Sequence, residues 1–315
     1  MAATGFLFVL LVAVLPLGAL GVLLLRLWGK AVRLFKGRPG RLAAAADWKP
    51  LWVGAAGYLL VFIGASAWAL AFEPDWVALE RTRIAVDSPV LGRRTFRILH
   101  VTDLHLDAFG DRERVLLDVA RREVPDLILF TGDYVNCREA VPDLAALLRR
   151  LKAPHGIYGV EGHHDHKFRI AGAFEEAGAT LLRDEFVQIG TDGRRVVVAG
   201  LSSLGARTLP EVLRTAPEGA FRIVLNHEPD LADRLSPGDA DLYLCGHTHG
   251  GQIRVPFLGP LLPGWRSEAR VPAGESRRGA TVVILNRGLG MSGGPLPRAR
   301  LGARPEIRII ELVAP

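Results

Sequence analysis

The chain has 315 residues, enough for one sizeable domain with an appendage or for two small domains. Its hydrophobic fraction of 49% and its positive mean hydropathy are high for a wholly soluble protein. The net charge of +6 comes from one segment, because residues 26–50 contain seven of the 39 basic residues and one of the 33 acidic ones, and the remaining 32 of each sign cancel. The rest of the chain has no net charge to attract a phosphate backbone, which argues against a nucleic-acid partner.

Two apolar runs, residues 6–25 and 52–72, flank this basic segment. About 20 apolar residues suffice to cross a bilayer core as a helix. The first run has no basic residues before it and no plausible cleavage site after it, which disfavours a removed signal peptide. Two buried helices of a soluble core would normally keep a polar face over that length. We therefore predict a membrane anchor over residues 1–75, with two transmembrane helices joined by the basic loop 26–50, and a catalytic domain over residues 76–315.

The charge of the loop predicts the orientation of this hairpin. Short loops rich in Lys and Arg lie on the cytoplasmic side of membranes, whereas the segment after the second run opens with Glu73, Pro74 and Asp75. We therefore expect a multi-pass protein of the cell membrane with its domain on the non-cytoplasmic face. Pro16 and several glycines interrupt the runs, so inversion or an interfacial position stays open.

From about residue 94, short apolar strands alternate with amphipathic helical segments. The predicted strands are residues 95–101, 126–131, 156–160, 194–200, 221–226, 240–245, 281–286 and 306–312, and the predicted helices are residues 112–123, 143–151 and 168–176. This alternation predicts an α/β domain with a largely parallel sheet in its first half. The later strands have little helix between them, which favours a mixed sheet or a second sheet there.

Aspartate and histidine residues follow these strands at the points where the strands end. They are Asp103 and His105 after the first strand, Asp133 after the second, His163 and His164 after the third, and His227 and His247 after later ones. Ligands of open α/β sheets bind beyond the carboxyl ends of the strands. We therefore expect these side chains to meet at one edge of the sheet. His100 lies within a strand and is expected to be a packed residue.

Each motif is weak alone, since D-x-H and G-D are common in surface turns and HHDH (163–166) could be a solvated loop. GHTHG (246–250) is more informative, because two imidazoles two residues apart in a Gly-flanked loop can reach one pocket. The occurrence of all these motifs in order along one chain, each after an apolar strand, favours a shared metal site over separate surface turns. Clustered His and Asp suit divalent metals, with imidazole favouring Zn, Fe, Mn or Co and carboxylate able to bridge two ions. Two such ions can clamp a phosphoryl group and activate water.

The ordered set resembles the signature of the calcineurin-like metallophosphoesterases: D-x-H, G-D, G-N-H-(D/E), H and G-H-x-H. The matching residues are Asp103-Leu104-His105, Gly132-Asp133, Gly162-His163-His164-Asp165, His227 and Gly246-His247-Thr248-His249. The segments NHEPD (226–230), HGGQI (249–253), NRGLG (286–290) and RPEI (304–307) are similar to the membrane-associated, YkuE-like branch of bacterial phosphodiesterases. The resemblance covers the chain from about residue 94 onward.

The resemblance implies a fold, a reaction and a set of roles. The fold is a four-layer αββα sandwich, here preceded by the two-helix transmembrane hairpin. Two divalent ions (Mn, Zn or Fe) would activate a hydroxide that hydrolyses a phosphodiester or pyrophosphate. The implied metal ligands are Asp103, His105 and His249 for one ion, His163, His227 and His247 for the other, and Asp133 as the bridge. His164 matches the general acid, and an imidazole suits that role because its pKa lies near the working pH.

One position departs from the signature, because His163 replaces the family's Asn, a neutral oxygen ligand. His163 could ligate through nitrogen, could turn away so that water fills the position, or could leave the second site weak. Asn136, Arg254 and Arg287 are candidates for contacts with substrate, and each could equally be an ordinary loop residue.

The expected partners are a phosphoester substrate, with lipid linkage as one option, and the bilayer; no obligatory protein partner is inferred. One sharper alternative, by resemblance only, is a UDP-2,3-diacylglucosamine hydrolase of lipid A synthesis, which needs a cytoplasmic domain and is disfavoured by the charge bias. The other alternative is a non-catalytic binding scaffold of the same fold, which the complete set of ligands and His164 argues against.

Overall fold

The computed structural model describes residues 49–86, 95–190, 196–202, 209–255, 259–260, 273–293 and 298–314. The chain divides into two compact units. One consists of Met1–Ala71 with Gly293–Arg298, and the other of Phe72–Ser292 with Ala299–Pro315. The second unit contains every β-strand of the described residues.

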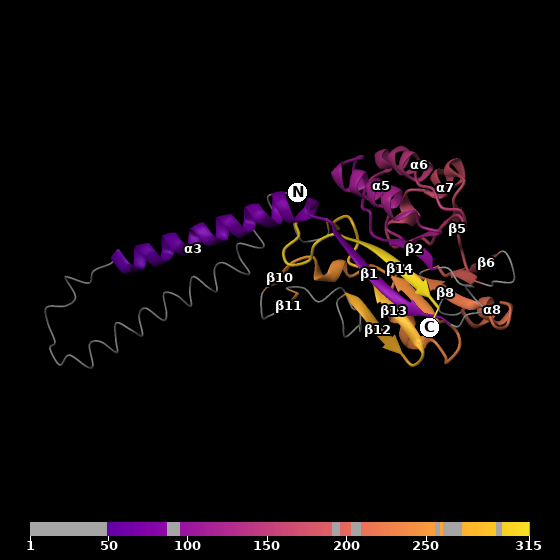
Figure 1. Cartoon of the computed structure of the whole chain (residues 1–315). Coiled ribbons are helices and arrows are strands. Elements are labelled where there is room, and N and C mark those ends of the chain that lie inside the picture. The colour runs from indigo at the N-terminus through magenta and orange to yellow at the C-terminus, as the bar shows by residue number, and fades with distance from the viewer. Residues whose placement is uncertain are drawn as a thin grey trace. The chain divides into compact units, whose positions relative to one another are not determined.

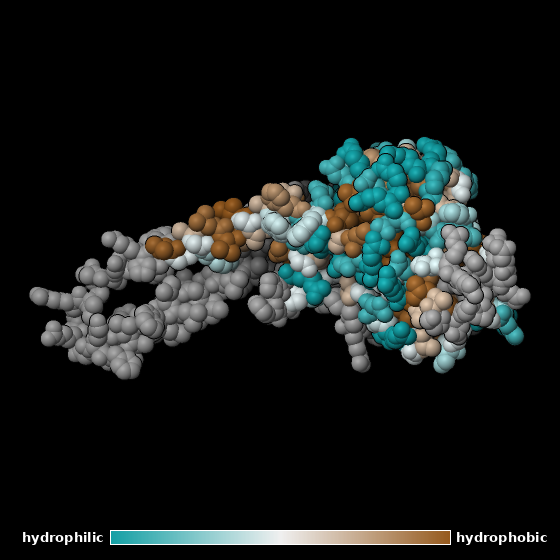
Figure 2. All heavy atoms as spheres, viewed as in Figure 1, coloured by the Kyte–Doolittle hydropathy of each residue, from teal (hydrophilic) through white to brown (hydrophobic). Residues whose placement is uncertain are grey.

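Helix α3 (Lys49–Ala67), extended by a π-helical turn over Trp68–Phe72, forms the second apolar run as predicted. Apolar side chains gather along the face of this helix that is seen in Figure 2, and Val53, Leu60 and Val61 are each at least 70% exposed. The helical stretch Val53–Asp75 is the one candidate membrane span among the described residues, by length and composition. The first apolar run and the basic loop up to residue 48 lie outside the described residues, so the predicted two-helix hairpin is not confirmed.

The first sheet of the second unit has six strands among the described residues. Their order is β1 (Ala78–Ala85), β14 (Glu306–Val313), β2 (Phe96–Val101), β3 (Leu127–Phe130), β4 (Ile157–Gly159) and β5 (Thr180–Leu181). Strands β2 to β5 are parallel, β14 is antiparallel to β2, and β1 is parallel to β14. Each residue of β3 is buried, which explains its uninterrupted apolar sequence LILF.

The second sheet also has six described strands. Their order is β12 (Gly274–Arg278), β13 (Thr281–Leu285), β9 (Leu242–Cys245), β8 (Phe221–Leu225), β7 (Val196–Gly200) and β6 (Glu185–Ile189). The four central strands are parallel, and the two edge strands are antiparallel to their neighbours. A short ribbon pairs β10 (Arg254–Val255) with β11 (Gly259–Pro260).

Three apolar cores separate four layers. Helices α5 (Asp111–Glu123), α6 (Val141–Arg150) and α7 (Ala171–Ala177) cover the outer face of the first sheet (Figure 1). The two sheets pack on each other through a second core, and α8 (Leu209–Arg214) and the 3-10 helix Pro229–Arg234 pack on the outer face of the second sheet. Side chains alternate accordingly along β2, where Leu99 joins the helical core and Ile98 the core between the sheets.

The predicted α/β sandwich is confirmed in its layers and in its mixed second half. The predicted strands appear within two residues of their expected bounds, and the predicted helices within three. Strands β1, β5, β6, β10, β11 and β12 were not predicted. The expectation that all the polar side chains share the edge of one sheet is wrong, because β8 and β9 belong to the second sheet.

Candidate metal centre

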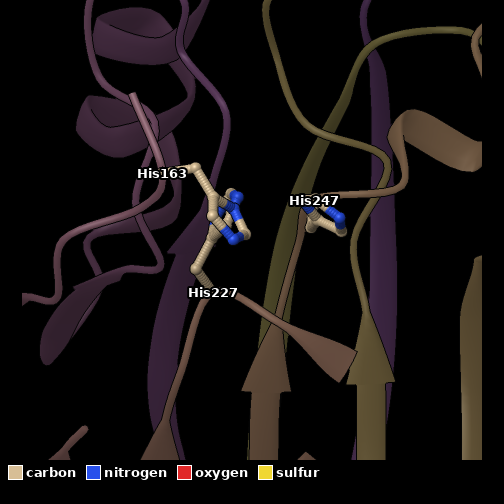
Figure 3. A group of neighbouring side chains, drawn as sticks. All are labelled: His163, His227 and His247. Carbon is tan, nitrogen blue, oxygen red and sulfur yellow. The ribbon is translucent and has the colours of Figure 1, made fainter. Parts of the chain in front are cut away.

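The predicted ligands meet where the parallel strands of both sheets end. From the first sheet, Asp103 and His105 follow β2, Asp133 follows β3 and His163 follows β4. From the second sheet, His227 follows β8, and His247 and His249 follow β9. Figure 3 shows three of these imidazoles, each from a different segment, turned toward one another. The structure thus brings together all seven predicted metal ligands in three overlapping groups.

Five of these seven residues have a positive φ, a conformation that non-glycine residues rarely adopt. They are Asp103 (49°), His105 (43°), Asp133 (55°), His247 (75°) and His249 (51°). Such residues cost about 1–3 kcal/mol each and persist where the surrounding structure holds them. Here the backbone N–H of Asp103 donates to Gly132, and that of His105 donates to Asp133. The strained backbone conformations are therefore concentrated at the residues whose side chains converge where the strands of both sheets end.

Two glycines allow these loops to approach closely. Gly132 has φ +93°, and a Cβ on it would lie 2.6 Å from the backbone nitrogen of Gly162. A Cβ on Gly162 would lie 2.3 Å from Oδ1 of Asp133. Both distances are shorter than any real contact, so the loops after β3 and β4 can touch only if both positions are glycine.

The ligand atoms form three overlapping groups. Within each group the atoms lie within 4.8 Å of one another, and the groups are Asp103, His105 and His249; Asp103, Asp133 and His227; and His163, His227 and His247. Oδ2 of Asp133 lies 3.6 Å from Nε2 of His105 and 3.4 Å from Nε2 of His227. Asp133 therefore stands between the first and the last group, where a bridging carboxylate would be.

In two of the imidazoles, a hydrogen bond at one ring nitrogen fixes the orientation of the ring, and the other ring nitrogen has no hydrogen-bond partner among the described residues. Nδ1 of His227 faces the carbonyl oxygen of Thr131 at 2.7 Å, and Nδ1 of His105 faces Oδ1 of Asn136 at 2.9 Å. Because both partners are acceptors, each Nδ1 is the donor, and each Nε2 is the atom that remains to bind a proton or a metal ion. Those Nε2 atoms and Oδ1 of Asp103 are among the buried side-chain atoms that have no hydrogen-bond partner in the described part of the chain. Unsatisfied buried acceptors converging on one point fit a metal cation.

The charges around the site favour a cation. Burial lowers the pKa of His249 to about 3 and also lowers that of His105, so both imidazoles are neutral. Burial alone would lower the pKa of His227, but the carboxylates of Asp133 and Asp103 raise it to about 10. Burial alone would raise the pKa of Asp133, but His227 and His105 hold it well below its usual range. Carboxylates that favour a proton on His227 favour a bound metal ion in the same way.

Comparison with known proteins agrees with this geometry. The model of the family described as calcineurin-like phosphoesterase matches residues 96–251. The metallophosphoesterase YkuE of Bacillus subtilis, described as uncharacterized, is 32% identical over 295 residues, which cover 89% of this chain and 96% of YkuE. The chain belongs to the calcineurin-like phosphoesterase family.

A further relative and a solved structure are also similar to this chain. The phosphodiesterase YaeI of Escherichia coli is 32% identical over 76% of this chain and 90% of YaeI. The crystal structure of TT1561 of Thermus thermophilus aligns with a TM-score of 0.42 at 15% identity, over 62% of this chain and 91% of that one.

Asp165, the last residue of the G-H-H-D motif, holds two loops of this calcineurin-like site together. Its buried carboxylate accepts the backbone N–H groups of Asp133 and Gly162 at 2.7 Å each and that of Tyr134 at 2.8 Å. The loop after β3 and the loop after β4 are thus fixed to a single side chain.

The other predicted site residues lie in different surroundings. His164 is partly buried, its ring centroid is 5.1 Å from that of His105, and its backbone N–H donates to Oδ1 of Asp133. Asn136 lies behind His105, where it accepts from the ring and donates to the backbone carbonyl. Arg254 is partly buried in β10.

Arg287 makes ion pairs with Glu80 at 2.8 Å and with Glu306 at 3.0 Å. Its guanidinium is therefore engaged by two carboxylates of the first sheet. His100 is fully buried and bonded to Thr131, as expected of a packed residue.

Arg300 is a part of the site that sequence reasoning missed. It is fully buried, and it donates to backbone carbonyl groups of the surrounding loops, those of Arg287, Gly288, Gly290 and Ala303. Its guanidinium also lies 3.4 Å from Nδ1 of His249. Burial lowers the pKa of Arg300 to about 9. The only sequence signal is its proximity to the RPEI segment, and that does not distinguish it from the neighbouring arginines.

Proposed function

We propose that this chain hydrolyses phosphodiesters or pyrophosphates with two divalent metal ions, Mn, Zn or Fe, at a membrane. The observation that carries the proposal is the set of three overlapping ligand groups with unpartnered acceptor atoms. Membership of the family and the phosphodiesterase YaeI among the relatives support a phosphoester substrate.

Roles follow from the position of each side chain. Asp103, His105 and His249 would hold one ion, and His163, His227 and His247 the other, with Asp133 between them. When bound, the ions would neutralise phosphoryl charge and make hydroxide available near neutral pH. His164, beside His105, would donate a proton to the leaving oxygen, and Asp133 orients it through the backbone of residue 164.

The proposed membrane location rests on α3 and on the sequence before it. The charge of the loop 26–50 favours a domain on the non-cytoplasmic face. A substrate at or near the membrane, lipid-linked or not, would then lie within reach of the site. No observation on the described residues favours the UDP-2,3-diacylglucosamine hydrolase alternative over this general assignment.

The test strips metal from the full chain in detergent and restores Mn²⁺, Zn²⁺, Fe²⁺ or Co²⁺ one at a time. Hydrolysis of bis-nitrophenyl phosphate and of nitrophenyl phosphate is then measured. Metal-dependent turnover of either ester is the expected result, and the ratio of the two gives the preference for diester or monoester. No turnover with any metal would favour the scaffold alternative. A soluble fragment should begin at Phe72, because Glu73 accepts the backbone N–H of Ala303 and β1 begins at Ala78.

The role of His164 is tested with two leaving groups. We expect His164→Ala to slow a diester with an alcohol leaving group by about 10²–10⁴-fold, the usual contribution of a general acid. The loss on bis-nitrophenyl phosphate should be much smaller, because nitrophenolate leaves without a proton. His166→Ala is the matched control, since it removes an exposed imidazole from the same loop. Equal losses on both substrates would contradict the assignment of His164 as the acid.

A further inference from the structure

The ion pair between His163 and Glu228 is a feature that the family signature does not contain. Nε2 of His163 lies 2.8 Å from Oε1 of Glu228. The two side chains are 45% and 32% exposed, and an ion pair with that exposure contributes at most about 1 kcal/mol to stability. Its significance must therefore lie in the orientation of the imidazole rather than in the stability of the fold.

The pair determines which nitrogen of His163 can face a metal. Because Nε2 is bonded to the carboxylate, Nδ1 is the nitrogen left to join the group with His227 and His247. The His163 ring centroid lies 5.3 Å from that of His227 and 4.9 Å from that of His247 (Figure 3). Nδ1 of an imidazole and Oδ1 of an amide are both bonded to Cγ. Nδ1 of His163 can therefore take the position of the amide oxygen that the signature places there.

The backbone of Glu228 is held in place independently of His163. Its N–H donates to Oδ1 of Asn226 at 2.8 Å, and its carbonyl accepts the hydroxyl of the fully buried Tyr243 at 2.6 Å. Glu228 also directly follows His227. One rigid segment thus supplies a ligand to the metal group and a carboxylate to the neighbouring imidazole.

We propose that Glu228 is a positioning residue that bonds Nε2–H of His163 and directs Nδ1 of His163 to the second metal ion. Metal-bound histidines commonly donate their other N–H to a carboxylate, which fixes the ring and raises its basicity, and loss of that carboxylate lowers metal affinity 10–100-fold. This inference rests on the proposed function for the existence of the metal pair. In this proposal, Glu228 compensates for the presence of His163 where the signature has Asn, because it fixes the ring of His163.

The test is a double-mutant cycle on the full chain in detergent, with binding of Zn²⁺ as the readout. We expect Glu228→Ala to weaken the second of two Zn²⁺ ions by about 10–100-fold and to leave the first unchanged, with a smaller loss for Glu228→Gln. In a His163→Asn background, Glu228→Ala should change Zn²⁺ affinity less than about threefold, because an amide ligand needs no carboxylate behind it. X-ray absorption at the zinc edge should show one imidazole fewer per two ions in His163→Asn.

Glu161→Gln is the matched control for charge. Its carboxylate is near the same loop but pairs with Arg183 at 2.9 Å, so its removal should leave Zn²⁺ binding unchanged. Circular dichroism of the metal-free variants checks that each is folded.

Three results would overturn the proposal: equal losses from Glu228→Ala in both backgrounds, no loss in the native background, or an unchanged imidazole count in His163→Asn. Absence of Zn²⁺ binding to the native chain would overturn both this proposal and the proposed function. The two are otherwise separable on the same samples. Coupling between His163 and Glu228 without phosphoester hydrolysis would contradict the proposed function alone, and hydrolysis without coupling would contradict the positioning role alone.

Discussion

At the scale of single residues, Asp165 shows how the site holds residues of positive φ in place. Its carboxylate accepts three backbone N–H groups from the loops after β3 and β4, and Asp133, which has a positive φ, supplies one of them. Without an acceptor, each buried N–H would cost about 1–3 kcal/mol. The same carboxylate therefore contributes to stability and holds Asp133 in its position between the ligand groups.

We expect Asp165→Ala to lower both the free energy of unfolding, by about 2–4 kcal/mol, and the affinity for metal, by at least tenfold. Chemical denaturation of the metal-free chain and titration with Zn²⁺ measure the two effects. Asp126→Ala is the matched control, since Asp126 also accepts a backbone N–H, that of Arg97 at 2.8 Å, on an exposed part of the sheet. Metal affinity as high in Asp165→Ala as in the control would show that Asp165 does not position the ligands.

That these candidate ligands come together could be predicted, because they recur in a fixed order after apolar strands. The residues that support them could not, since nothing in the sequence near Arg300 shows that it becomes fully buried against loop carbonyls. Glu228 and His163 are 65 positions apart and meet only because β4 and β8 end at the same place. Asp165 lies within a motif, but its three bonds depend on the loop after β3.

At the scale of elements, two of the strands that were missed, β1 and β12, are rich in charged residues. Strand β1 has the sequence ALERTRIA, whose charged side chains conceal the alternation expected of a half-buried strand. Its charges are used at the edge of the sheet, where Arg81 pairs with Glu123 and Arg83 with Glu311. Strand β12, with the sequence GESRR, is likewise a charged strand at the edge of a sheet, in this case the second sheet. The apolar strands were predicted because burial on both faces leaves a continuous hydrophobic run.

Helix α3 permits a prediction about the membrane. Leu60 and Val61 are 70% and 71% exposed, and charges near the middle of a membrane span cost about 2.5–3.5 kcal/mol each. We expect the double substitution of Leu60 and Val61 by Lys to move a measurable part of the expressed chain from the membrane fraction to the soluble fraction. Val124→Lys, at an apolar position 67% exposed on the domain, should not change the distribution. An unchanged distribution in the double variant would show that α3 does not anchor the chain.

At the scale of the whole second unit, the candidate metal centre draws its residues from both sheets. Asp103, His105, Asp133 and His163 come from the first sheet, and His227, His247 and His249 from the second. Between the sheets lies an apolar core, but at this edge the facing groups are carboxylates and imidazoles with unpartnered atoms. Apolar packing cannot stabilise that edge, so a cation bound to both sheets should contribute to the stability of the unit.

We therefore expect metal removal to lower the thermal unfolding temperature. A ligand that binds only the folded state stabilises it by about 2.7 kcal/mol at 100 times its Kd, and in a unit of this size each kcal/mol corresponds to about 2–4 °C. Chelation followed by Zn²⁺ or Mn²⁺ at that excess should thus lower and then restore the unfolding temperature by about 5–10 °C, as measured by scanning fluorimetry. In a variant with both His249→Ala and His227→Ala, the metal-dependent part should disappear, because one ligand is lost from each proposed ion. An equal metal response in that variant would mean that the stabilising ion binds elsewhere, and that the two sheets are held together at this edge by something other than the metal centre.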